Sequence, residues 1–219
     1  NIVGDIGFYI YQQIYPFLAI VMVLSTTGFP VILSKLLNEY SGDKNYYNLR
    51  KILIVCFSFF VFISLLSFTS LFVGAEKLAH WMGDPKLSLL LKVAACAFLF
   101  FPFISILRGF FQSFQEMLPV SLSQIVEKAI RVGSLLSITF FFIYKGFDLY
   151  VTAAGAVFSS LIGYIGAFAL LFVYSKKRIP LLFSRSSGEV SVSAKLILKK
   201  LLIYTVTICL TSMLFIFMQ

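Results

Sequence analysis

Charged residues are scarce in this 219-residue sequence: Asp, Glu, Lys and Arg together make up only 12% of it, whereas 60% of the residues are hydrophobic. A soluble domain carries about twice that share of charge. The mean hydropathy of +0.97 agrees with this composition. The sequence therefore excludes a soluble globular protein and predicts an all-α membrane protein that crosses the bilayer several times.

Cysteine and histidine are also rare. The three cysteines, Cys56, Cys96 and Cys209, lie inside hydrophobic runs without CxxC or metal-ligand spacing, so we interpret them as apolar packing residues that form no disulfide. The single His80 has no partner at metal-ligand spacing, and the acidic residues are scattered singly. No phosphate-binding loop, HExxH or GxSxG pattern occurs. We therefore expect no catalytic residue, no metal site and no cofactor.

Six hydrophobic segments predict about six transmembrane helices, at residues 9–34, 52–73, 87–107, 119–144, 149–174 and 201–218. The first segment contains Gly28 and Pro30, which predict a kink because proline removes one backbone hydrogen bond. Pro102 predicts a second kink, and Pro119 is expected to be the first residue of its helix. The polar stretches 38–51 and 74–86 are expected to be loops, and residues 145–148 a tight turn.

The net charge of +9 does not indicate a nucleic-acid partner, because the basic residues lie between hydrophobic segments, where they orient membrane proteins. Counted on alternate sides of the predicted helices, 12 Lys and Arg residues fall on one side and four on the other. The richer side is expected to be cytoplasmic. Its members are Lys35, Lys44, Arg50, Lys51, Arg108, Lys176, Lys177, Arg178, Arg185, Lys195, Lys199 and Lys200, against Lys77, Lys86, Lys92 and Lys145.

Charged residues inside the fourth segment are the main candidates for a functional site. The uncharged run 132–144 has only 13 residues, so the helix must begin earlier to cross a core of about 30 Å. Glu127 and Arg131 then lie roughly 12 and 18 Å from Pro119, near the middle of the membrane. Spacings of three and four place a polar stripe on one face of this helix, made of Gln124, Glu127, Arg131 and Ser134, with Lys128 beside it.

Ionisable groups inside a membrane usually face a bundle interior or a watery cavity. We therefore treat these five residues as candidates for binding an anionic substrate, and expect Glu127 to pair with Arg131 one turn away. An alternative is that residues 121–131 lie along the membrane surface as an amphipathic segment. From the residues alone, a transporter ranks first, a membrane enzyme with a lipid substrate second, and a structural membrane subunit third.

The fifth segment carries small residues every four positions: Gly155, Ser159, Gly163 and Ala167. Small residues at this spacing allow a second helix to approach closely. The pattern predicts helix packing and no chemistry.

Three stretches resemble the polysaccharide-transport flippases of the multidrug/oligosaccharidyl-lipid/polysaccharide exporter superfamily, in particular the type represented by stage V sporulation protein B. They are IVGDIGFYIYQQIYP at residues 2–16, LSTTGFPVILSKLLNE at 24–39 and RGFFQSFQEMLPVSLSQIVEKAIRV at 108–132. The combination of RGxxQ, MxP and SQxxExxxR is specific. These stretches also contain four residues that we treat as motif or gating candidates: Arg108, Gln112, Gly28 and Pro30.

The resemblance implies a fold of about 14 helices in two lobes that work by alternating access. The sequence has no initial Met and stops inside a hydrophobic run, so we expect residues 1–219 to be part of the N-terminal lobe, holding its second to seventh helices. The implied substrate is an undecaprenyl-pyrophosphate-linked oligosaccharide or peptidoglycan precursor, moved across the plasma membrane of a Gram-positive bacterium. Membrane lipids and a coupling H⁺ or Na⁺ are the other expected partners, and a multidrug exporter is the alternative function.

Overall fold

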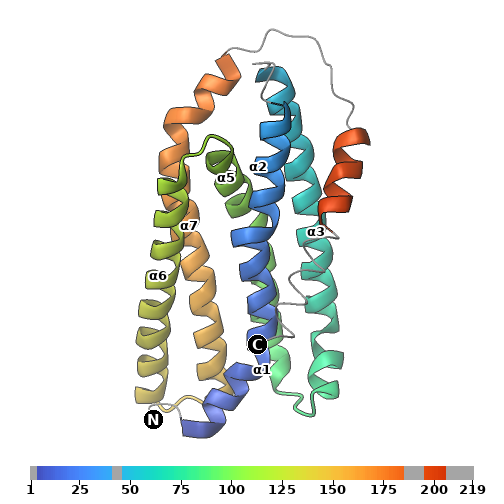
Figure 1. Ribbon diagram of the computed structural model, residues 1–219. Coiled ribbons are helices and arrows are strands. Elements are labelled where there is room, and N and C mark those ends of the chain that lie inside the picture. The colour runs from blue at the N-terminus through green and yellow to red at the C-terminus, as the bar shows by residue number, and fades with distance from the viewer. Residues whose placement is uncertain (1–3, 41–45, 185–194, 206–219) are drawn as a thin grey trace. The chain divides into compact units, whose positions relative to one another are not determined.

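The computed structural model describes residues 4–40, 46–184 and 195–205, and within these ranges it contains helices and turns but no strand. The all-α prediction is therefore confirmed. The helices, labelled in Figure 1, are α1 (Gly4–Val23), the π-helix η1 (Leu24–Gly28), α2 (Phe29–Tyr40), α3 (Tyr46–Trp81), α4 (Leu87–Phe98), α5 (Phe101–Ser113), α6 (Met117–Tyr144) and α7 (Leu149–Ser184). Residues 195–205 are helical as well.

Four stretches in the described ranges are long and apolar enough to cross a membrane: Tyr9–Tyr40, Asn48–Trp81, Leu87–Ser113 and Leu149–Lys176. They contain the predicted segments 9–34, 52–73, 87–107 and 149–174. Helix α6 is one continuous helix of 28 residues but is not among the four, because Glu127, Lys128 and Arg131 interrupt its apolar character. Most of the predicted segment 201–218 lies outside the described residues.

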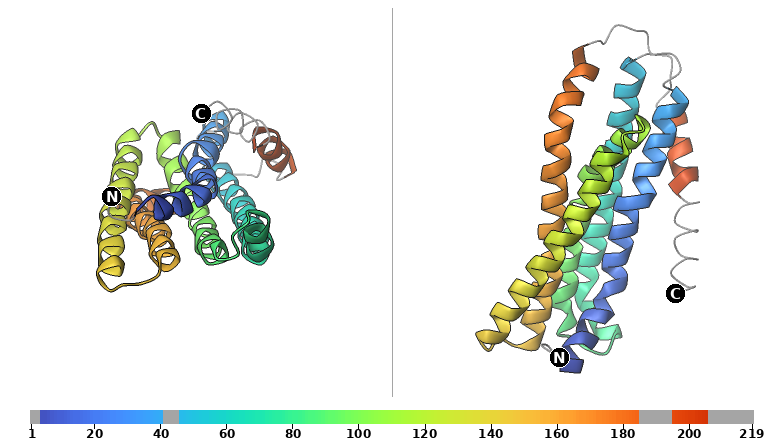
Figure 2. Two further views of the ribbon diagram at one scale, coloured as in Figure 1. Left: turned by 90° about the horizontal axis from the view of Figure 1, so that it is seen from below. Right: turned by 60° about the vertical axis from the view of Figure 1, so that its left-hand side comes forward.

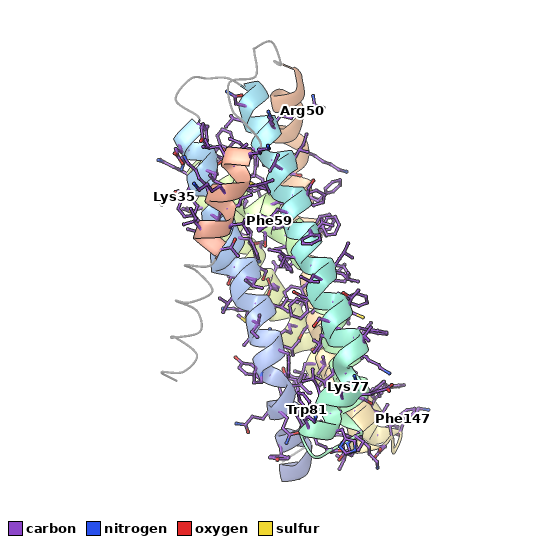
Figure 3. All side chains as sticks on the ribbon, turned by 90° about the vertical axis from the view of Figure 1, so that its right-hand side faces the viewer. Lys35, Arg50, Phe59, Lys77, Trp81 and Phe147 are labelled. Atoms are coloured by element: carbon purple, nitrogen blue, oxygen red, sulfur yellow. The ribbon has the colours of Figure 1, made fainter. Side chains whose placement is uncertain are left out.

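Two predicted loops are wrong over most of their described length. Helices occupy residues 38–40 and 46–51 of the first, and 74–81 of the second. The physical reason is that α3, with 36 residues, is about 54 Å long and extends beyond a hydrocarbon core of about 30 Å. Its last turns can therefore carry polar side chains such as Lys77, and Trp81 there is 85% exposed, as suits an aromatic residue at the membrane interface (Figure 3).

At the two prolines where the sequence predicts kinks, Pro30 and Pro102, the regular α-helix changes nearby, whereas Pro16 lies inside α1 without interrupting it. Leu99 and Phe100 form a turn between α4 and α5, and Pro102 is the second residue of α5. The first segment contains the π-helix η1 directly before Phe29 and Pro30. Helix α6 begins at Met117, two residues earlier than predicted, so that Pro119 lies in its first turn, where a missing N–H leaves no bond unmade.

The chain divides into two compact units, and each long helix contributes residues to both. The first unit comprises Asn1–Met22, Ile63–Phe101 and Ser123–Ala167. Within it, α6 and α7 run side by side (Figure 2). The hydroxyl of Ser64 on α3 donates to the Phe98 carbonyl on α4 at 2.7 Å, which satisfies a buried polar group.

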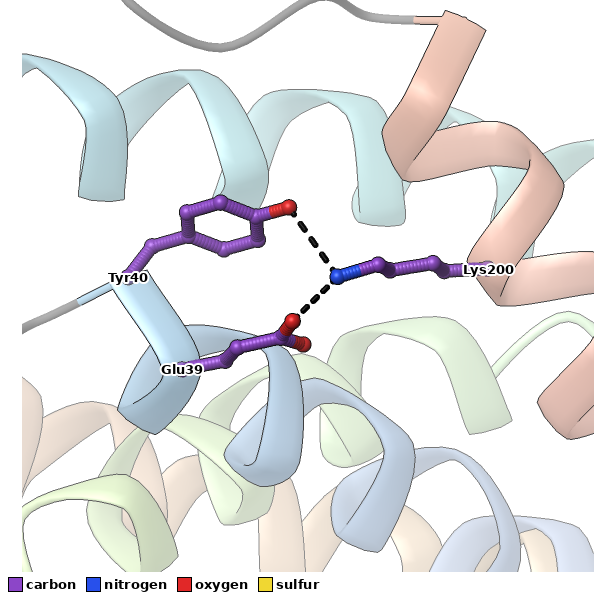
Figure 4. A network of polar contacts seen from close by, with 3 residues as sticks. All are labelled: Glu39, Tyr40 and Lys200. Carbon is purple, nitrogen blue, oxygen red and sulfur yellow. Dashed lines mark hydrogen bonds and ion pairs between the residues drawn. The ribbon is translucent and has the colours of Figure 1, made fainter.

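The second unit comprises Val23–Phe62, Pro102–Leu122 and Phe168–Gln219. Aromatic contacts join its helices: the rings of Phe29 and Phe60 lie 4.3 Å apart, and the ring of Phe103 lies 5.5 Å from that of Phe57. At the end of α2, Lys200 donates to the carboxylate of Glu39 and to the hydroxyl of Tyr40 (Figure 4).

Candidate functional site

The α6 polar stripe, defined as Gln124, Glu127, Arg131 and Ser134, lies in the first unit. Glu127 is only 2% exposed, and the other three residues are half-buried. Lys128 is exposed, so it does not share the environment of the stripe. Because α6 is not among the four candidate membrane-spanning stretches of the described residues, both the membrane-spanning interpretation of this segment and the surface alternative stay predictions.

Helix α7 packs directly against the stripe through Gly163. A Cβ atom added to Gly163 would stand 2.8 Å from the backbone oxygen of Glu127 and 3.1 Å from Cβ of Arg131. The Ser134 hydroxyl donates to the Ile130 carbonyl at 2.6 Å and lies 3.5 Å from the backbone oxygen of Ser159 on α7. The backbones of α6 and α7 therefore approach as closely as a glycine permits.

The predicted small-residue seam is confirmed as a contact between α7 and α6. A Cβ at Gly155 would stand 2.7 Å from Cγ2 of Ile138. The structure adds Gly166, where a Cβ would stand 2.4 Å from Cδ1 of Ile130. Gly166 does not follow the spacing of four. The only feature of the sequence that could have indicated its contact with α6 is its position three residues after Gly163. Ala167 is fully buried.

The guanidinium of Arg131 faces α1. Its Nη1 lies 4.0 Å from Sδ of Met22. A thioether is a weak acceptor without charge, so this contact does not neutralise the guanidinium. The ion pair between Glu127 and Arg131 stays a prediction.

This arrangement can hold an anion. A guanidinium remains charged at any physiological pH and presents a planar fork of donors that matches phosphate oxygens. Among the described residues no group of three His, Cys, Asp or Glu side chains is placed to hold a metal ion.

The other predicted candidates all belong to the second unit. Arg108 on α5 is completely buried, and its Nη1 donates to the backbone oxygen of Ser25 in η1 at 3.1 Å. Gly28 and Pro30 follow Ser25 closely in the sequence, and both are buried. Gln112 lies one turn beyond Arg108 on α5 and is half-buried. The start of the α5 motif therefore contacts the segment that contains η1 and the start of α2, and we call this contact the Arg108 junction (Ser25, Pro30, Arg108 and Gly109).

The sequence did not indicate Ser25 or Gly109 as members of this junction. A Cβ at Gly109 would stand 2.8 Å from the Pro30 oxygen and 2.9 Å from Cβ of Leu33, so glycine is needed for the approach of α5 to α2. The only available signal was the position of Gly109 directly after Arg108 in the motif.

Comparison with known proteins gives a consistent result. A family model described as polysaccharide biosynthesis protein matches residues 1–218. The chain is 47% identical over 220 residues to the "uncharacterized membrane protein YabM" of Bacillus subtilis (strain 168), covering 100% of this chain and 40% of that protein.

Two further relatives come from the same organism. They are the lipid II flippase MurJ, 31% identical over 187 residues, and stage V sporulation protein B, 31% identical over 176 residues. Each match covers 80% of this chain and about a third of the relative, 34% and 33% respectively. The chain thus spans less than half the length of these relatives. No solved structure matches it. With its apolar helices, the chain is a multi-pass protein of the plasma membrane.

Proposed function

Because the chain belongs to the polysaccharide biosynthesis protein family, we propose that the complete protein is a transporter that moves a lipid-linked oligosaccharide or peptidoglycan precursor across the plasma membrane by alternating access. Residues 1–219 would supply part of its N-terminal lobe. The name of one relative, lipid II flippase, supports this class of cargo.

The observation that carries the proposal is the α6 polar stripe. The pyrophosphate of a lipid-linked precursor must leave the headgroup layer and cross an interior of low dielectric constant. A half-buried cation on the route lowers that barrier, and Arg131 offers one whose contact with Met22 leaves its charge available.

Glu127 has a supporting role in this proposal. Its carboxylate, one turn from Arg131, would hold the guanidinium while the cavity is empty and release it when the anion arrives. The competing role is structural: the pair would only pin α6 to its neighbours. The two roles differ in their response to mutation, because removing one partner of a buried pair costs about 3–5 kcal/mol, whereas replacing both partners can be nearly neutral.

The test uses the full-length protein in cells from which the native copy has been depleted. We expect depletion to cause the lipid-linked precursor to accumulate without loss of its synthesis, and mass spectrometry of the lipid pool measures this accumulation. A membrane enzyme would instead leave an unprocessed lipid of different mass. This measurement also identifies the cargo.

The variants then test the stripe. Glu127→Gln combined with Arg131→Gln should insert normally but fail to complement, and Arg131→Lys should retain partial activity because it keeps the charge but loses the fork. The matched control is Lys145→Gln, which removes an exposed charge in the turn after α6 and should complement fully. A fully active, normally expressed Arg131→Gln protein would exclude Arg131 as the anion contact.

A further inference from the structure

The π-helical turn η1 leaves one particular carbonyl group without its helical partner. The N–H of Phe29 donates to the oxygen of Leu24, five residues earlier. In the same register the next bond would run from residue 30 to the oxygen of Ser25. Residue 30 is proline and has no N–H to donate. The carbonyl of Ser25 therefore needs a donor from elsewhere.

Arg108 is that donor. Its Nη1 lies 3.1 Å from the Ser25 oxygen, and both residues are completely buried. A buried carbonyl inside a membrane protein has no water to replace a missing hydrogen bond, so an unmet acceptor is costly there. A guanidinium donor gives a charge-assisted bond, which is stronger than a bond between neutral groups.

The neighbouring residues of α5 are suited to this contact. Because Gly109 has no side chain, the backbone of α5 can lie against the Pro30 carbonyl and the Leu33 side chain. Ser105 lies on the same face of α5, one turn before Arg108, and is also buried. Within the described part of the chain, its hydroxyl has no hydrogen-bond partner. Ser105 therefore contributes no polar bond that would join α5 to η1, and it provides a matched control.

We propose that the Arg108 guanidinium replaces the amide hydrogen that Pro30 lacks, and that this bond makes Arg108 the positioning residue of the η1 turn. The bond joins α5 to the segment that contains η1 and the start of α2. These two segments then move as one body in any conformational change, and η1 is a fixed connection between α1 and α2 and not a hinge. The proposal concerns the junction itself and does not depend on the cargo.

If Arg108 replaces the missing N–H, the effect of substituting Arg108 on the opening of η1 depends on whether residue 30 is proline. Pro30→Ala restores an N–H that can bond the carbonyls of η1, so a donor at position 108 should then matter much less. A role of Arg108 in packing alone would not change with residue 30. The experiment is therefore a double-mutant cycle of Arg108→Met, which keeps the length of the side chain and removes its donors, with Pro30→Ala.

The measurement is amide hydrogen exchange of peptides that cover residues 24–33, in the full-length protein in lipid nanodiscs. Arg108→Met should speed this exchange by about tenfold or more, because the turn opens more often. In the Pro30→Ala background the same change should speed the exchange by a clearly smaller factor, because the N–H of residue 30 can then bond the carbonyls of η1. Arg108→Lys should fall between Met and the native residue, and Ser105→Ala should leave the exchange unchanged.

Native exchange in Arg108→Met, or an equal effect of this change in both backgrounds, would overturn the proposal. If the Arg108→Met protein does not reach the membrane in measurable amounts, the membrane levels of the other variants decide. If the double variant accumulates, the restored N–H compensates for the lost donor, which supports the proposal. If Pro30→Ala accumulates but the double variant does not, the proposal is overturned.

Discussion

Gly163 of α7 lies against the backbone carbonyl of Glu127 on α6, so closely that a Cβ atom would stand only 2.8 Å from the oxygen. A flexible side chain could move aside, but the backbone of a packed helix cannot do so without shifting the helix. The position of the polar stripe is therefore set by the absence of a side chain on the neighbouring helix.

The first prediction follows from this contact. Gly163→Ala should destabilise the protein by about 1–3 kcal/mol, because the added methyl group forces α7 away from α6. The control is Gly133→Ala on α6, where a Cβ has nothing within 4 Å; it should leave stability unchanged or raise it slightly. Unfolding in detergent measures both, and equal stability of the two variants would contradict the close packing.

The second prediction concerns the loop between α3 and α4. The hydroxyl of Tyr150 on α7 donates to Oδ2 of Asp84 at 2.5 Å, while Oδ1 accepts the N–H of Lys86 at 3.0 Å. Tyr150→Phe removes only the bond between α7 and the loop. Hydrogen exchange of residues 82–86 should rise severalfold, because the loop opens more easily. Tyr144→Phe, at a residue that is 81% exposed, is the control and should not change this exchange.

The third prediction uses the pKa of Lys200. Its hydrogen bond to the Glu39 carboxylate, followed by that to the Tyr40 hydroxyl, raises this pKa above the ordinary lysine value. Only the unprotonated amine reacts with acylating reagents, so at pH 9 the pair slows the reaction of Lys200. Glu39→Gln lowers the pKa again and should increase the acylation rate, as followed by mass spectrometry.

The exposed Lys195 is an internal control for this measurement, because its rate should be the same in both proteins. An unchanged rate at Lys200 would show that the contact in Figure 4 does not hold the amine in its charged form.

The fourth prediction is the orientation of the chain. Single cysteines are introduced into a protein that lacks Cys56, Cys96 and Cys209, and intact cells are treated with an impermeant maleimide. Positions His80 and Gly146 should be labelled, whereas Asp43, Ser113 and Ser187 should react only after permeabilisation. Asp43 and Ser187 lie outside the described residues. Labelling of position 187 on intact cells would reverse the orientation.

Local patterns in the sequence were sufficient to predict the helical class, the helical character of residues 119–144 and the seam of α7. Each of these depends on residues that are close in the chain, where helical periodicity decides which side chains share a face. Helix ends were predicted less well. The long helix α3 continues through polar residues because a helix that has left the hydrocarbon core can still make its own backbone hydrogen bonds.

Contacts between distant residues could not be predicted in this way. Arg108 and Ser25 are 83 positions apart, and nothing in either stretch specifies the other. The resemblance identified Arg108 and Pro30 as important, but only the structure places the guanidinium on the carbonyl of Ser25. The position of the α6 polar stripe was predictable from spacing, whereas its contacts with Met22 and Gly163 were not.

The tight turn at residues 145–148 has a consequence for how this chain enters the membrane during synthesis. After Arg131, helix α6 has only 13 uncharged residues, and each charged residue at mid-membrane costs about 2.5–3.5 kcal/mol on the insertion scale. Helix α7 is apolar over Leu149–Lys176 and packs against α6 through glycines. We therefore expect α6 to leave the translocon only together with α7, as a helical hairpin, so that a ribosome stalled before α7 emerges would leave α6 outside the lipid.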